Sequence, residues 1–160
     1  MAKPKNHTAL TYDTVRQQMA NYCSKAERCR NDVLKKLRTL PLQSDEKASI
    51  IEYLEKEGYI NDLRYAKAFV HDKLHFDGWG KLKIKIALQQ KNIDESIIES
   101  ALNDIDDATY IRVLTDILTK KLKTLPQTLD SFERKHKLFQ FGYQRGFGGQ
   151  PLEEVIEKLL

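Results

Sequence analysis

Apolar residues recur along this chain at spacings of three and four positions, between polar residues that are typical of helix ends. Gly58 and Asn92 accept the left-handed conformation in which many helices stop, and Asn61 or Asp62 offers a side-chain oxygen to cap the next helix. The pattern predicts an all-α chain of nine helices. They are expected to begin near Thr11, Ser24, Ser44, Asn61, Gly80, Asp94, Asp106 or Asp107, Asp130 and Pro151.

Two of these starts carry a capping box, in which the cap and the residue three positions later hydrogen-bond to each other's backbone. The boxes are Ser24 with Glu27 and Asp130 with Glu133. The helix that follows Asp130 is expected to carry an apolar stripe of Phe132, His136, Phe139 and Tyr143. Gly142 lies inside the same helix and costs roughly 1 kcal/mol relative to alanine, so this part of the chain is expected to be looser.

An internal repeat is visible in the sequence. The segment SIIEYL at Ser49 aligns with SIIESA at Ser96, a period of 47 residues, and less closely with PLEEVI at Pro151. Periods of about 20 to 50 residues are typical of modular arrays, and a three-helix unit of this size has to pack on its neighbours. We therefore expect an elongated tandem array of three three-helix repeats, over residues 11–60, 61–106 and 107–160, preceded by a mobile N-terminal arm, residues 1–10.

The segment KLKIKIAL from Lys81 alternates as a β-strand would, but helix caps bound it on both sides, and we predict a helix. At 100° per residue this helix has two apolar faces. One is expected to fill the core of its own repeat: Ile84, Ala87 and Leu88. The other has Leu82 and Ile86, flanked by Lys81 and Lys85, and meets either a neighbouring repeat or a partner.

The net charge of +4 is too small to indicate a nucleic-acid-binding protein, but it is unevenly distributed. Cys23–Pro41 holds six basic and two acidic residues, Lys73–Lys91 holds five basic and one acidic, and Asp94–Asp107 holds six acidic and no basic residues. Solvated helix faces and partner-binding patches both account for this pattern.

The sequence offers no convincing catalytic or metal-binding motif. His71 and His75 have the spacing of a zinc pair, but Asp72 stands where a metalloprotease needs glutamate, and no third ligand follows at a recognisable spacing. Cys23 and Cys29 fit neither a metal pair nor a disulfide framework. We expect a monomeric non-enzyme without cofactor or metal. Because no apolar run of about 18 residues or signal peptide is present, we expect it in the cytoplasm and off the membrane.

The runs GYINDLRYAKAFVHDK and GKLKIKIALQQKNIDESIIESAL resemble the RecX family of bacterial recombination regulators. The resemblance covers nearly the whole chain and is strongest over residues 50 to 102; Asn92 replaces the usual glycine. The positions that match the family motifs, and are expected to be structural, are Gly58, Asp62, Tyr65, Ala66, Phe69, Gly80, Ile84, Leu88 and Ile93; Arg64 and Lys91 match as well.

The resemblance implies an array that lies in the groove of the RecA nucleoprotein filament and suppresses its ATPase, strand-exchange and self-cleavage-promoting activities. The candidate partner-binding residues are Arg28, Arg30, Lys35, Lys36, Arg64, Lys81, Leu82, Lys85 and Ile86. An alternative is a basic helical module that acts directly on single- or double-stranded DNA, whose binding would depend steeply on salt. The sequence leaves open whether DNA is contacted.

Overall fold

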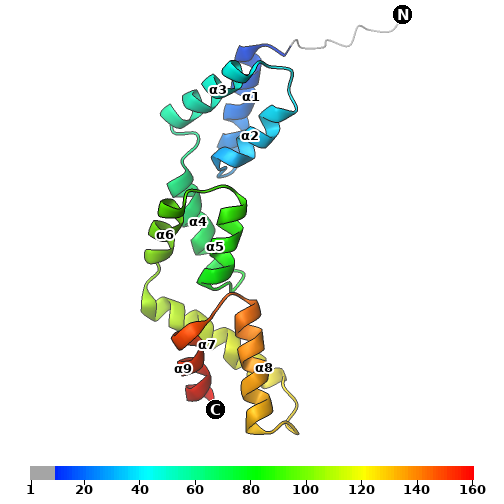
Figure 1. Ribbon diagram of the computed structural model, residues 1–160, viewed down its shortest axis with the longest axis vertical. Helices are drawn as coiled ribbons and strands as arrows, with labels where there is room; N and C mark the ends of the chain where they lie inside the picture. Colours follow the sequence, from blue (N-terminus) through cyan, green and yellow to red (C-terminus); the bar gives the residue numbers. More distant parts are fainter. Residues whose placement is uncertain (1–9) are drawn as a thin grey trace, which may run out of the picture. The chain divides into compact units, whose positions relative to one another are not determined.

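The computed structural model describes residues 10–160, and these residues form nine α-helices and no β-strand (Figure 1). The all-α prediction is confirmed. The helices are α1 (Tyr12–Lys25), α2 (Arg30–Arg38), α3 (Ser44–Lys56), α4 (Asp62–His75), α5 (Lys81–Gln90), α6 (Glu95–Asn103), α7 (Asp107–Thr124), α8 (Ser131–Gln144) and α9 (Gly149–Leu159).

The chain divides into two compact units, Met1–Tyr65 and Ala66–Leu160. Helix α4 begins in the first unit and continues into the second. The expected division into three repeats and the expected elongated shape stay predictions. The N-terminal arm, predicted over residues 1–10, lies outside the described residues except for Leu10.

The first unit has one apolar core, to which α1, α2 and α3 all contribute. Val15, Val33, Ile50 and Leu54 have no solvent exposure. Both cysteines are buried. The chain leaves α3 at Gly58, whose φ of 77° agrees with its predicted role as a helix stop.

The predicted start of the second helix is wrong. Ser24 belongs to α1, where its hydroxyl donates a 2.8 Å hydrogen bond to the carbonyl of Ala20. The cap of α2 is Cys29, five residues after the predicted cap, and its N–H donates to the carboxylate of Asp32 at 3.2 Å. The carboxylate of Glu27 is held by Arg64 instead. A contact across 37 residues of sequence therefore overrides a local capping signal.

In the second unit, α5 is a helix and not a strand, as predicted, and it stops at Asn92 with a φ of 56°. Ile84 and Leu88 have no solvent exposure, so the expected inner face is indeed filled.

Asn61, in the first unit, was predicted as a cap of α4, and its side chain accepts a 2.9 Å hydrogen bond from the N–H of Arg64.

Helix α5 is joined to the loop between α8 and α9 through the backbone. The N–H of Gly80 donates to the carbonyl of Arg145 at 2.7 Å, and the N–H of Leu82 donates to the carbonyl of Gly146 at 3.1 Å. A Cβ on Gly80 would overlap the backbone carbonyl group of Gly146. Glycine is therefore required here because two backbones approach closely.

The predicted apolar stripe of α8 is also wrong. The helix buries Leu138 and Gly142, while Phe132, Phe139 and Tyr143 are exposed. A Cβ on Gly142 would lie 2.5 Å from Leu152 Cδ1 of α9, so the glycine permits a close helix contact. Gly142 was expected to loosen this region, but it allows tight packing instead. The absence of a side chain is what lets α9 approach α8.

Candidate functional site

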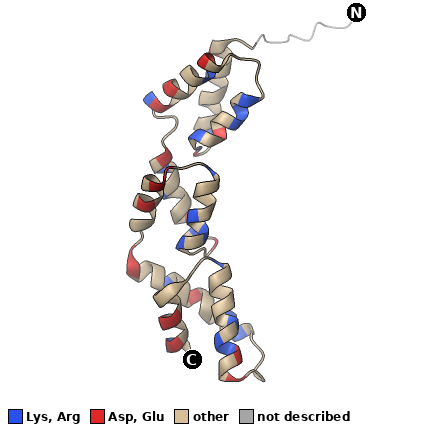
Figure 2. Cartoon of the chain, in the orientation of Figure 1, with Lys and Arg blue, Asp and Glu red and all other residues tan. Residues whose placement is uncertain are grey.

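The candidate cations of the first unit lie on and around α2, which Figure 2 shows as a helix with basic segments. The side chains of Lys35 and Lys36 are exposed. The ammonium of Lys36 lies 4.2 Å from the centroid of the Tyr22 ring, and Arg28 Cζ lies 4.1 Å from it. One aromatic ring thus positions two positive charges, and such a group can bind a carboxylate or a phosphate on a partner.

Two of the candidate arginines have partners inside the unit. Arg30 pairs with Glu55, with 3.2 Å between Nε and Oε1, and its N–H donates to Asp62 at 2.8 Å. Arg64 pairs with Glu27 at 2.7 Å and donates to the carbonyl of Gly58 at 3.1 Å. These contacts link the start of α4 to α2 and α3. Arg30 and Arg64 therefore have structural roles, whether or not a partner also contacts them.

Most of the family-motif positions are buried. Tyr65, Ala66 and Ile93 are buried, like the core positions of α5, and Phe69 is partly buried. The carboxylate of Asp62 accepts the hydrogen bond from Arg30 described above. The structural role expected of these positions stays a prediction.

The second candidate surface is the outer face of α5. Leu82 is 50% exposed and Ile86 is 56% exposed, although both are aliphatic. Leu82 leans toward the loop after α8, because its Cδ1 would lie 3.2 Å from a Cβ on Gly148. The surroundings of the two side chains therefore differ: Leu82 lies partly against the α8–α9 loop, and Ile86 faces solvent.

The lysines beside this face are held by neighbours. Lys85 Nζ lies 2.8 Å from Glu95 Oε1, and this hydrogen bond raises the pKa of Lys85 and lowers the pKa of Glu95. Lys81 Nζ lies 4.9 Å from the centroid of the Tyr110 ring. The Tyr110 hydroxyl accepts a 3.0 Å hydrogen bond from the backbone N–H of Lys81, and burial raises the pKa of the phenol. The face thus presents apolar area with a charged border whose orientation is fixed.

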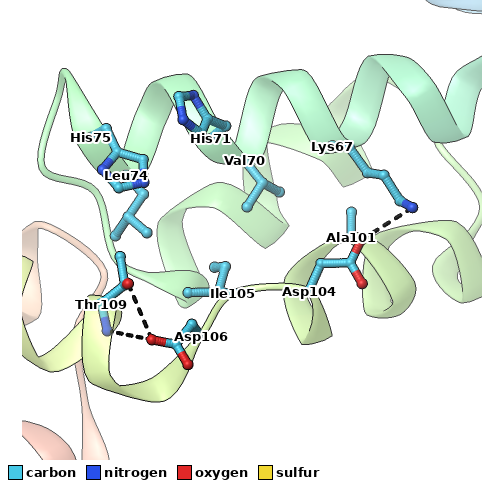
Figure 3. Close-up of a pocket in the computed structure, with 10 residues that line it drawn as sticks. All are labelled: Lys67, Val70, His71, Leu74, His75, Ala101, Asp104, Ile105, Asp106 and Thr109. Atoms are coloured by element: carbon cyan, nitrogen blue, oxygen red, sulfur yellow. Dashed lines mark hydrogen bonds and ion pairs between the residues drawn. The ribbon is translucent and has the colours of Figure 1, made fainter.

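A pocket of about 340 Å³ lies between α4 and the segment that joins α6 to α7 (Figure 3). Figure 3 shows the apolar side chains of Val70, Leu74 and Ile105 within it, and an ion pair of 3.1 Å between Lys67 and Asp104 at one end.

His71 and His75 line the other end of this pocket, with ring centroids 4.5 Å apart. His71 also lies 3.3 Å from Asp72. In the described part of the chain no group of three histidine, cysteine, aspartate or glutamate side chains is placed to hold a metal ion. The pocket therefore supplies apolar surface and no recognisable catalytic arrangement.

No helix within residues 10–160 is both long enough and apolar enough to cross a bilayer.

Residues 61–102 match the family model described as RecX, second three-helix domain. The chain is 32% identical over 126 residues to the regulatory protein RecX of Clostridium beijerinckii, which covers 78% of this chain and 57% of that protein. It is 29% identical to the regulatory protein RecX of Clostridium botulinum, with coverage of 78% and 58%. The chain thus spans a little under three fifths of these two relatives. With the regulatory protein RecX of Chlorobium phaeobacteroides, it shares 29% identity and covers 85% of the relative.

A solved structure has the same fold. The crystal structure of RecX from Lactobacillus salivarius has a TM-score of 0.85 and 27% sequence identity, and the match covers 92% of this chain and 96% of that chain. The chain therefore resembles the RecX family of regulatory proteins in both sequence and fold.

Proposed function

We propose that this protein is a regulator of RecA, which binds the RecA nucleoprotein filament and inhibits its recombinase, ATPase and coprotease activities. The resemblance to the RecX family supports this, since the relatives are named regulatory proteins. In this proposal the chain acts as a cytoplasmic monomer, by occupying a surface, and uses neither a catalytic residue nor a cofactor.

The observation that carries the proposal is the exposed aliphatic face of α5. Its opposite face is completely filled by Ile84 and Leu88, so the fold has no use for Ile86 in its own core. Exposed apolar area beside charges of fixed orientation is typical of a protein interface. We propose that Leu82 and Ile86, with Lys81 and Lys85 at the border, contact the filament.

The second candidate function is direct binding to DNA, which the charge of α2 favours. Lys35 and Lys36 are exposed, and the segment from Cys23 to Pro41 holds six basic and two acidic residues. Phosphate binding by such a segment would weaken steeply with salt. In the proposal made here, these cations with Arg28 instead face acidic groups of the filament.

A titration of the protein into DNA-dependent ATP hydrolysis by RecA tests the proposal. Hydrolysis should fall as the protein is added, and the fall should persist when bare duplex DNA is in excess. If hydrolysis is unchanged at saturating protein, the proposal is wrong. Inhibition that disappears with excess bare duplex DNA would favour the DNA-binding module.

Variants of α5 test the surface. Ile86→Ser should need several-fold more protein for the same inhibition, without loss of melting temperature, because Ile86 is exposed. Leu63→Ser is the matched control, since Leu63 is an exposed leucine on α4.

Lys85→Glu alone removes the ion pair with Glu95, whereas Lys85→Glu combined with Glu95→Lys restores it with the charges exchanged. If the filament contacts Lys85, both variants should inhibit weakly. Recovery in the double variant would assign the lysine to the fold alone.

A further inference from the structure

Helix α8 presents a row of aromatic rings to solvent. Phe132 is 79% exposed, Phe139 is 39% exposed and Tyr143 is 61% exposed, and the imidazole of His136 lies among them. At 100° per residue these four positions fall within roughly 60° of the helix circumference and extend over about 16 Å of its length. The rings of Phe139 and Tyr143 are nearly parallel, at 9° and 6.2 Å between centroids. We call this set the aromatic face of α8.

The packing of α8 against the rest of the fold keeps these rings exposed. The other side of α8 is fixed by Leu138, which has no solvent exposure, and by the close approach of Gly142 to Leu152. A rotation that buried the aromatic face would expose Leu138 and separate α8 from α9. The fold therefore keeps four rings in water, at a hydrophobic cost that a binding partner would remove.

Lys135 borders this face and lines a hollow with Phe132, His136 and Phe139, and further basic residues lie close by in the sequence. Residues 120–137, the last turns of α7 and the first turns of α8, hold six basic and two acidic side chains, and Figure 2 shows the basic segments of these two helices. The basic residues are Lys120, Lys121, Lys123, Arg134, Lys135 and Lys137.

The two acidic residues here, Asp130 and Glu133, are engaged with each other's backbone in the capping box. Arg134 holds the carbonyls of Gln127 and Leu129. Among the ion pairs of residues 10–160, none involves Lys135 or Lys137. Lysine charge next to the rings is thus left without a carboxylate partner.

We propose that the aromatic face of α8 binds single-stranded nucleic acid, with bases on the rings and phosphates on the nearby lysines. Unpaired bases stack on aromatic side chains whatever their sequence, and a basic border follows the backbone. A shallow hollow of about 200 Å³ between Phe132, Lys135, His136 and Phe139 provides both chemistries in one place.

The composition of the face favours a nucleic acid over a partner helix. A docking groove for a helix is normally lined with leucine, isoleucine, valine or methionine, and the aromatic face contains none of them. A duplex is disfavoured because its bases are already stacked on one another. The inference stands independently of regulation of RecA, and the binding measurement below contains no RecA.

The test measures binding of a fluorescein-labelled oligothymidylate by fluorescence anisotropy. An abasic strand of the same length and phosphate charge is the comparison ligand. The protein should bind the oligothymidylate and bind the abasic strand at least about fivefold more weakly, since stacking on each ring contributes that much or more. No binding of the oligothymidylate, or equal affinity for the two strands, would overturn the proposal.

Substitutions at Tyr143 separate stacking from general hydrophobic contact. Tyr143→Phe keeps the ring and should bind as the unaltered protein does, whereas Tyr143→Leu keeps apolar area and should lose about fivefold or more. Equal binding by these two variants would contradict base stacking. If both bind the strand normally but Tyr143→Leu loses inhibition of RecA, the face binds protein and the proposal is wrong.

Phe132→Ala has a matched control in Phe76→Ala. Phe76 is 78% exposed and lies in the same unit, just after α4, and it is not part of the aromatic face of α8. Both variants should keep the melting temperature, because neither ring is in the core. Only Phe132→Ala should weaken binding, and an equal loss in the two variants would count against a site on α8.

Discussion

Helices α5 and α8 have the same construction and opposite outer chemistry. Each buries a narrow aliphatic face, Ile84 and Leu88 in α5 and Leu138 with Gly142 in α8, and each is positioned by a glycine against a neighbouring segment. Their outer faces differ: α5 exposes aliphatic side chains beside an ion-paired lysine, and α8 exposes aromatic rings beside lysines that form no ion pair within residues 10–160.

This difference shows which positions the fold constrains. A helix that packs on its neighbours along one face needs about one inward side chain per turn, and the positions on the other side are available for binding. Two surfaces of one unit can therefore serve different partners, protein at α5 and nucleic acid at α8. The following predictions separate the contacts that hold each helix from those that are free to bind.

The largest effect is expected where two backbones meet. Gly80→Ala should lower the free energy of unfolding by about 3 kcal/mol, because its Cβ would overlap the carbonyl group of Gly146 and no flexible side chain can yield. Chemical denaturation measures this loss. Gly148→Ala is the control: its Cβ meets only Leu82 Cδ1 at 3.2 Å, so it should change stability by less than about 1 kcal/mol. Equal losses would mean that the junction is not tightly packed.

A smaller loss is expected at Gly142, where the obstructing group is a side chain. Gly142→Ala in an exposed helix would stabilise by about 1 kcal/mol, but here overpacking against Leu152 should reverse the sign and cost about 1.5 kcal/mol. Adding Leu152→Ala should remove that clash, so the double variant should lose less than the sum of the two single losses in a urea-denaturation cycle. A stabilising Gly142→Ala would show that α9 is not in close contact.

Tyr110 contributes a hydrogen bond and a pH dependence. Tyr110→Phe should cost about 1 kcal/mol by leaving the N–H of Lys81 without its partner. Since burial raises the pKa of the phenol above its ordinary value of 10.0, the folded state favours the neutral form, and the stability from Tyr110 is present below pH 10.0 and lost as pH rises through the folded-state pKa. The stability difference between the protein and Tyr110→Phe should therefore shrink in alkaline denaturation series. A constant difference would contradict this.

The smallest effect is expected at Lys85. Lys85→Gln removes the ion pair with Glu95 at a solvated position, so the melting temperature should not change measurably at physiological salt. A clear drop in melting temperature would show that the pair holds α5 against α6. Weaker inhibition of RecA at unchanged melting temperature would instead assign Lys85 to the α5 surface.

Local signals in the sequence predicted much of this fold. Gly58 and Asn92 adopt the left-handed conformations expected of helix stops, and the box of Asp130 and Glu133 forms as expected. These features depend on residues within one turn of each other. The cap predicted at Ser24 fails because of a contact between residues distant in sequence. Glu27 pairs with Arg64, and no local pattern in the sequence indicates that pairing.

The sequence predicted the outer face of α5 but not the aromatic face of α8. The reason is again that local patterns report only local contacts. The two faces of α5 follow from helical periodicity, because aliphatic residues occupy both sides. The aromatic face of α8 could not be assigned that way, since phenylalanine is expected inside a core, and its orientation depends on the contact of Gly142 with Leu152. The sequence did contain one signal of exposure: the basic run from Arg134 to Lys137 interrupts the aromatic positions.

The core of the first unit closes within a short stretch of chain. Its buried residues lie between Val15 and Ile60, and the ion pairs of Arg30 and Arg64 are also made within residues 1–65. Contacts between segments close in sequence form quickly, and domains generally fold as units while synthesis continues. The first unit thus has all the residues of its core once Tyr65 has left the ribosome, so formation of this core need not wait for the surfaces of the second unit to be made.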